Sequence, residues 1–185
     1  MSEASTFEAS AQAATQVRLF GTFRIGGGEG ASAPGRKSRA LLAYLILAAP
    51  EAVSRERLAG LLWGDRQEEQ ARGSLRFALH ELRAVTGDAS PLLSATRTEV
   101  RLEPGRVATD LDRLRALAEG SDAAAIAAAL GEQPGELLSD LDDIDAGFDD
   151  WLASERVRRR EQRRQIAIAV ARRALTITPR CGAIC

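Results

Sequence analysis

The sequence of 185 residues predicts an α+β fold, a winged helix-turn-helix followed by an all-α helical segment. Two observations predict this fold class. A β-forming run is followed by three helical patterns and a β-hairpin, which is the element order of a winged helix-turn-helix. Beyond Asp110 every pattern is helical. We therefore expect a disordered lead-in (1–16), a winged helix-turn-helix (17–104), a partial helical domain (109–178) and an atypical tail (179–185).

The first strand region and the first helix follow from local composition. The range 17–25 is rich in β-forming residues but is interrupted at Gly21, so we expect two short strands or one bulged strand. The range 37–48 has the apolar content of a buried helix, which Pro50 stops.

Capping residues define the next two helices. Ser54 is a favourable N-cap for a short second helix, and Gly64 can end that helix in a left-handed conformation. Asp65 followed by Glu68 has the spacing of a capping box, so we expect it to open a third helix that runs to about residue 86 and is closed by Gly87.

A hairpin and three further helices complete the predicted elements. The ranges 92–94 and 100–102 flank a polar tetrapeptide, as in a β-hairpin with a polar tip. We then expect helices over 111–117, 123–130 and 151–175. The inner face of the last should contain Trp151, Leu152, Val157, Ile166 and Val170.

The third helix carries the candidate DNA-binding face. At about 100° per residue its apolar residues fall on one side, namely Ala71, Leu75, Ala78, Leu79 and Leu82. The other side carries a cationic stripe, which we expect to face DNA bases: Arg72, Arg76, His80 and Arg83. Arginine pairs with guanine edges or with phosphates, which makes this face a candidate recognition surface. The alternative interpretation is an ordinary solvated helix face.

Further residues are candidates for contact with the DNA backbone or for a wing. They are Arg36, Lys37, Arg66, Thr96, Arg97 and Thr98. Cations at the start of the first helix oppose its dipole, a cost that a nearby phosphate would relieve; a solvated loop is the alternative. An arginine at a hairpin tip can enter a minor groove or touch phosphates, and it also fits ordinary turn chemistry.

Charge is distributed in unlike blocks. Residues 17–109 carry 14 basic and 10 acidic side chains, 110–150 carry 2 and 12, and 151–185 carry 9 and 2, within a total of −1. This asymmetry favours a polyanion-facing front part and a second module with another task. The arginine run over 156–164 is either a second polyanion contact or, as we favour, the outer face of a helix.

Several functional classes are excluded or disfavoured by the sequence. No apolar run reaches the roughly 18–20 residues of a membrane helix and no export signal is visible, so we expect a cytoplasmic protein without membrane association. Arg36 breaks the contiguous Gly-Lys-Ser of a phosphate-binding loop, and the acidic run over 140–150 has the wrong register for calcium. His80 and the terminal Cys181 and Cys185 form no evident catalytic or zinc constellation, so we expect no enzyme activity, metal or cofactor.

Six segments together resemble one family of regulators: 17–25 (VRLFGTFRI), 35–45 (GRKSRALLAYL), 54–64 (SRERLAGLLWG), 69–83 (EQARGSLRFALHELR), 137–141 (LLSDL) and 148–156 (FDDWLASER). The sequence resembles transcriptional activators of the Streptomyces antibiotic regulatory protein type. These join an OmpR-type winged helix to a tetratricopeptide-like bacterial transcriptional activator domain. The resemblance implies promoter binding through the third helix and wing, RNA polymerase recruitment, and dimeric binding at direct repeats.

The family's activator domain is longer than the segment after Asp110, and the range 178–185 departs from it, so we expect a truncated or frameshifted chain. The sequence thus predicts a regulator that binds double-stranded promoter DNA in a sequence-specific manner. The alternative is a protein-interaction module in which the winged helix is a scaffold that does not contact DNA. DNA affinity that falls steeply with salt separates the two.

Overall fold

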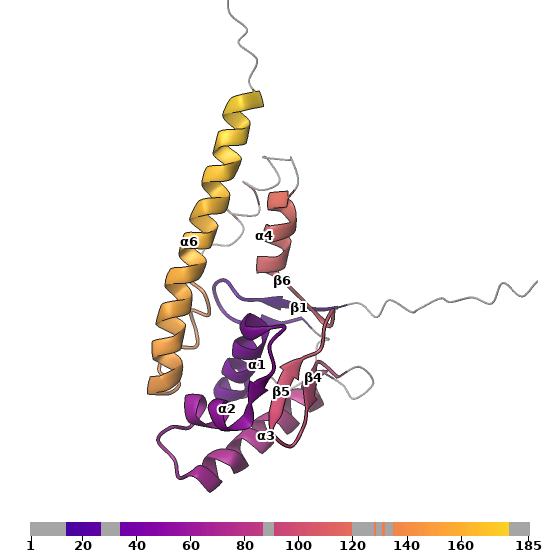
Figure 1. Ribbon diagram of the computed structural model, residues 1–185, viewed down its shortest axis with the longest axis vertical. Coiled ribbons are helices and arrows are strands. Elements are labelled where there is room, and N and C mark those ends of the chain that lie inside the picture. Colours follow the sequence, from indigo (N-terminus) through magenta and orange to yellow (C-terminus); the bar gives the residue numbers. More distant parts are fainter. Residues whose placement is uncertain are drawn as a thin grey trace, which may run out of the picture.

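The computed structural model describes residues 14–26, 34–86, 91–119, 128, 131 and 135–177. Its strands are β1 (Thr15–Arg18), β2 (Arg24–Ile25), β3 (Val53–Ser54), β4 (Leu93–Ala95), β5 (Glu99–Leu102) and β6 (Val107–Thr109). Its helices are α1 (Arg36–Ala48), α2 (Arg55–Leu62), α3 (Glu68–Thr86), α4 (Asp110–Glu119) and α6 (Ala146–Ile177). Figure 1 shows α1, α2, α3 and the β4–β5 hairpin gathered at one end, while α6 runs along the long axis past them. The fold is therefore a mixture of helices and small sheets.

The first sheet joins the two ends of the predicted winged-helix region. Its strand order is β2-β1-β6, with β1 antiparallel to β2 and parallel to β6. Gly21 has a φ of 81°, which turns the chain between the two short strands, one of the two expected arrangements. Two boundaries differ from prediction. Strand β1 begins at Thr15, inside the expected lead-in, and the sheet extends past residue 104 to Thr109 because β6 pairs with β1. Residues 1–13 lie outside the described residues.

Helices α1 and α2 begin close to the predicted positions. The Ser54 hydroxyl accepts a hydrogen bond from the Arg57 amide at 3.2 Å, which confirms the predicted N-cap of α2. The prediction for Gly64 was wrong, because its φ is not positive. A Cβ at Gly64 would lie 2.8 Å from the Gly60 carbonyl oxygen, so glycine is required there for a close backbone approach.

Helix α3 begins later than its sequence signal suggested. The chain first makes a turn in which the Arg66 amide donates to the Trp63 carbonyl at 3.1 Å. The helix then starts at Glu68, so Asp65 lies outside it and does not form the expected capping box. The predicted core face is confirmed, since all five of its residues are buried: Ala71, Leu75, Ala78, Leu79 and Leu82. The predicted terminator Gly87 lies outside the described residues.

The second sheet contains the predicted hairpin. Strands β4 and β5 are antiparallel, with Leu93 opposite Leu102, and the strand order is β3-β5-β4. Sequence reasoning did not predict β3, which places the residues just before α2 beside the hairpin. This pairing fixes the hairpin against the start of α2.

The segment after α4 is not entirely helical, contrary to expectation. Residues 135–145 form turns, and Leu137 makes an isolated β-bridge with Phe20. The Asp140 carboxylate accepts hydrogen bonds from the Phe23 amide and the Arg39 guanidinium, both at 2.7 Å. This segment pairs its polar groups with the N-terminal region, so no helix forms there. Most of the predicted helix over 123–130 lies outside the described residues.

Helix α6 starts at Ala146, before the predicted Trp151, and packs onto α1 and α2. The Trp151 ring lies 4.7 Å from the Tyr44 ring and 5.1 Å from the Phe148 ring, centroid to centroid. The predicted inner position Val157 is 63% exposed, while the buried stripe of Phe148 and Leu152 continues into the charged pair Glu155 and Arg159. One hydrophobic core runs from Val17 to Leu152, so both parts of the chain fold together. None of the helices that the structure describes is long and apolar enough to cross a membrane.

Candidate nucleic-acid interface

A basic groove lies between the start of α2, one flank of α3 and the β4–β5 turn. Its volume is about 630 Å³. The lining residues are Ser54, Arg55, Glu56, Leu75, Arg72, Arg76, Arg97 and Thr98. Four guanidinium groups and one carboxylate therefore border one concave surface, which we call the basic groove. Such an excess of positive charge attracts polyanions.

Backbone contacts hold the hairpin turn against α2. The Arg55 amide donates to the Thr98 carbonyl at 2.8 Å, and the Arg55 Nε donates to the Thr96 carbonyl at 2.8 Å. The Thr96 hydroxyl accepts from the Glu99 amide at 3.0 Å, which shapes the turn internally. Arg97 is thereby presented at the exposed tip, while the polar groups around it serve the turn.

The predicted cationic stripe of α3 is exposed as a whole. Arg72 forms an ion pair with Glu68 one turn earlier on the same helix. Within the part of the chain that the structure describes, Arg76, His80 and Arg83 form no hydrogen bond or ion pair through their side chains. Arg72 and Arg76 share the basic groove with Arg97, so the structure brings the predicted base-facing and wing residues together. Their roles toward DNA remain predictions.

The two residues of α1 that were predicted to contact the DNA backbone, Arg36 and Lys37, do not line the basic groove. The Arg36 guanidinium donates to the Asp140 and Asp142 carbonyls, and the Lys37 ammonium donates to the Leu62 carbonyl at 2.6 Å. Lys37 also lies 3.7 Å from the Asp145 carboxylate. These intramolecular contacts satisfy the cations at the start of α1 without a phosphate.

Arg66 occupies the same side of α3 as Arg36 and Lys37. Its guanidinium donates to the Ser74 hydroxyl at 2.8 Å. The three cations line a second groove of about 720 Å³ on the flank of α3 that carries Phe77. The structure therefore separates Arg36, Lys37 and Arg66 from the basic groove.

Sequence reasoning missed Arg55 as a member of the basic groove. The signal was its position directly after the N-cap Ser54, at the first turn of α2. That position becomes informative only when β3 places the start of α2 beside the hairpin. A nearby cation, Arg57, is held by the Tyr44 hydroxyl, to which its Nε donates at 3.0 Å, and this hydrogen bond raises the pKa of Arg57.

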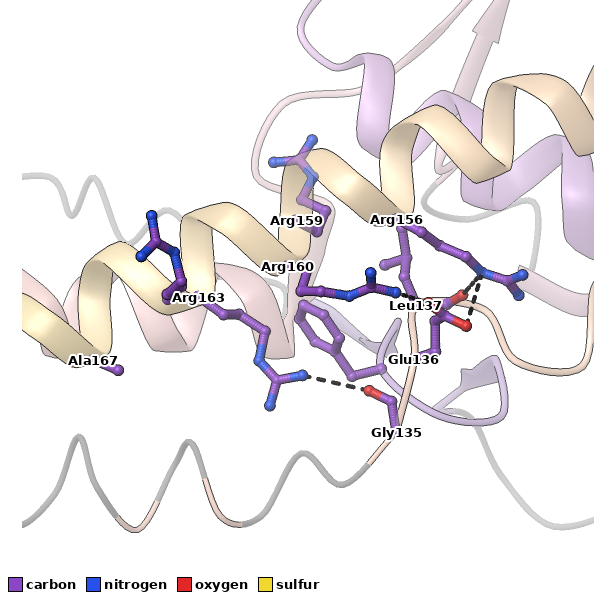
Figure 2. Close-up of a pocket in the computed structure, with 10 residues that line it drawn as sticks. Gly135, Glu136, Leu137, Arg156, Arg159, Arg160, Arg163 and Ala167 are labelled. Atoms are coloured by element: carbon purple, nitrogen blue, oxygen red, sulfur yellow. Dashed lines mark hydrogen bonds and ion pairs between the residues drawn. The ribbon is translucent and has the colours of Figure 1, made fainter.

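Arginines of the α6 run contact other parts of the same chain (Figure 2). Arg156 donates to the Leu137 and Leu138 carbonyls at 2.9 and 3.0 Å, and Arg160 forms an ion pair with Glu136. The Arg163 guanidinium lies 4.6 Å from the centre of the Phe20 ring. These contacts hold residues 135–138 against α6, which favours a structural role over a second polyanion contact.

Charge pairing on the outer turns of α6 is also local. Arg164 and Gln165 donate hydrogen bonds to the Glu161 carboxylate, which lowers the pKa of Glu161 to about 2.

Among the residues that the structure describes, no group of three or more His, Cys, Asp or Glu side chains is placed to hold a metal ion.

Comparison with known proteins gives a likeness of fold. Neither a protein-family model nor a curated protein sequence matches this chain. Among solved structures, the fold is similar to that of EmbR from Mycobacterium tuberculosis, determined in complex with a low affinity phosphopeptide, with a TM-score of 0.68. The two share 24% identity over 87% of this chain and 45% of that chain, so the present chain spans less than half of EmbR's length. This likeness establishes a shared fold.

Proposed function

We propose that this protein is a cytoplasmic transcriptional regulator of the activator type that binds promoter DNA in a sequence-specific manner. In this proposal α1 to α3 and the two small sheets form an OmpR-type winged helix-turn-helix. Helix α3 is the recognition helix, and the β4–β5 hairpin is the wing. The observation that carries the proposal is the convergence of Arg55, Arg72, Arg76 and Arg97 on one groove beside α3.

The physical argument rests on shape and charge. A helix with one buried and one cationic face can enter the major groove, about 12 Å wide, and place guanidiniums against guanine edges. The wing tip then lies over the neighbouring backbone or minor groove, where Arg97 contacts phosphate or sugar. Among the described residues no ion pair holds the side chains of Arg76, His80 or Arg83, so these side chains are available to DNA.

The second part of the proposal concerns residues 109–178. The resemblance of the ranges 137–141 and 148–156 to the start of a bacterial transcriptional activator domain supports a partial, tetratricopeptide-like helical domain. The same resemblance suggests RNA polymerase and a second copy of the chain as partners. The shared core that joins α6 to α1 and α2 couples this part to the DNA-binding part.

Selection of bound sites from a random duplex library tests the proposal. We expect one enriched sequence, bound far more tightly than a scrambled duplex, with an affinity that falls steeply as salt rises. Arg76→Ala should weaken binding to the enriched site by about 5- to 150-fold if this side chain pairs with a base. Arg164→Ala on α6 is the matched control, because it removes an exposed guanidinium that pairs with Glu161 on its own helix.

The opposing outcome is equally clear. A chain that enriches no sequence and has no salt-sensitive affinity for duplex DNA is a protein-interaction module built on a winged-helix scaffold. Equal affinity of wild type and Arg76→Ala for enriched and scrambled duplexes would contradict base recognition by α3.

A further inference from the structure

An exposed aromatic side chain occupies the outward face of α3. Phe77 is 68% exposed, and Val157 on α6 is the other large hydrophobic side chain exposed among the described residues. With Arg72 at zero and about 100° per residue, the buried residues of α3 centre near about 290°. Phe77 falls at about 140°, close to the direction opposite the core, and His80 falls at about 80°. Phe77 therefore lies nearer the outermost line of α3 than Arg72 or Arg76.

A glycine lies one turn before Phe77 on the same outward line. A Cβ at Gly73 would meet only the end of the Arg76 side chain, at 3.8 Å, so packing within the protein does not require glycine there. Glycine in a helix interior is destabilising relative to alanine. A glycine that the fold does not need allows another molecule to approach the helix backbone closely.

Neighbouring charges select the kind of molecule that can approach. The ring is flanked along the outward face by Arg76 and His80, while the carboxylate on its other side, Glu81, is turned toward α1. Glu81 accepts hydrogen bonds from the Gly35 amide at 2.9 Å and from the Ser38 hydroxyl. An apolar ring bordered by a guanidinium and an imidazole on an exposed helix suits a polyanion that also offers apolar groups. In the major groove of DNA, the thymine C5-methyl is such a group.

We propose that Phe77 is a specificity residue whose phenyl ring packs on the C5-methyl group of a thymine, with Gly73 permitting this approach. The proposal rests on the DNA-binding function proposed above. In this proposal the outermost part of α3 recognises thymine, whereas the arginines of the cationic stripe recognise guanine. The arginines supply contacts to guanine and phosphate, and Phe77 supplies the apolar contact.

The test compares wild type, Phe77→Ala and the control Val157→Ala in library selection. The control removes the other exposed apolar side chain, away from α3. Wild type and Val157→Ala should require thymine at one or two positions, and Phe77→Ala should accept any base there. Because Phe77 is exposed, Phe77→Ala should keep the thermal midpoint of the wild type, which separates loss of contact from loss of folding.

A second measurement isolates the methyl group. Replacing the required thymine by deoxyuridine removes only the C5-methyl, and it should weaken wild-type binding about fourfold, as expected for one buried methyl group. The same replacement should leave the affinity of Phe77→Ala unchanged. Equal sensitivity of both proteins to deoxyuridine, or a Phe77→Ala chain with the affinity and site preference of wild type, would overturn the proposal.

Failure of the broader function has a different signature. If wild type enriches no sequence, then both the DNA-binding function and the role of Phe77 are refuted. If wild type enriches a sequence in which no thymine is required, the function stands and the role of Phe77 alone is refuted.

Discussion

Glu68 limits the charge that α3 can offer to DNA. Its carboxylate forms an i, i+4 ion pair with Arg72, and the two side chains are 71% and 61% exposed. A phosphate must compete with this carboxylate for the same guanidinium. Replacing Glu68 by glutamine keeps the size of the side chain and removes its charge, so Glu68→Gln should strengthen DNA binding.

The magnitude follows from the number of guanidiniums in the basic groove. Three of the four, those of Arg55, Arg76 and Arg97, are not paired with a carboxylate in the groove. If each guanidinium, wherever it binds, is counted as neutralising one phosphate, the slope of log affinity against log salt is about −2.7. Release of Arg72 adds one phosphate contact and makes the slope about −3.6. The corresponding gain in affinity is about eightfold at 0.1 M salt. The exposed ion pair itself contributes little to stability, about 0.5 kcal/mol or less.

Fluorescence polarisation of labelled duplex between 50 and 200 mM salt measures both quantities. Glu161→Gln is the matched control, because it removes a carboxylate from an exposed, arginine-paired position on α6, far from α3. Wild type and Glu161→Gln should share one slope, and Glu68→Gln should be steeper. An unchanged slope for Glu68→Gln, or an equal gain for Glu161→Gln, would refute the assignment of Arg72 to the DNA-binding surface.

Two further predictions concern the fold that positions the site. Gly64→Ala places a Cβ 2.8 Å from the Gly60 carbonyl oxygen and should lower the free energy of unfolding by about 1–3 kcal/mol. Gly60→Ala, whose new Cβ meets nothing within 4 Å apart from its chain neighbours and the adjacent backbone of its own helix, should raise the free energy of unfolding by about 0.5–1 kcal/mol. Urea unfolding measures both, and equal effects would contradict the close approach. Asp140→Asn removes the charge that pairs with Arg39, a residue whose buried Nε already lacks a partner among the described atoms. Asp140→Asn should lower the free energy of unfolding by about 2 kcal/mol. An unchanged urea midpoint would show that the packing of the segment around Asp140 against residues 19–23 does not depend on this carboxylate.

Local sequence patterns determined the elements that carry the candidate site. The two-faced character of α3 follows from the spacing of its leucines and arginines, because side chains three and four residues apart share a helix face. Ser54 was recognisable as an N-cap, since its hydroxyl satisfies an amide only three residues away. The hairpin tip with Arg97 likewise follows from two short β-forming runs around a polar turn.

Contacts between residues far apart in sequence decided the rest. The Phe23 amide and its acceptor Asp140 are separated by 117 residues, so no local pattern could show that residues 135–145 pair with the N-terminal region. The same reason hid the place of Arg55 beside the hairpin, which depends on the pairing of β3 with β5. Gly64 kept its predicted place at the end of α2, but only packing revealed that a neighbouring carbonyl, and not a left-handed φ, requires glycine there. Sequence periodicity fixes which side of an element is apolar, whereas the tertiary structure decides what each side meets, because hydrogen bonds and packing join residues that the chain itself keeps apart.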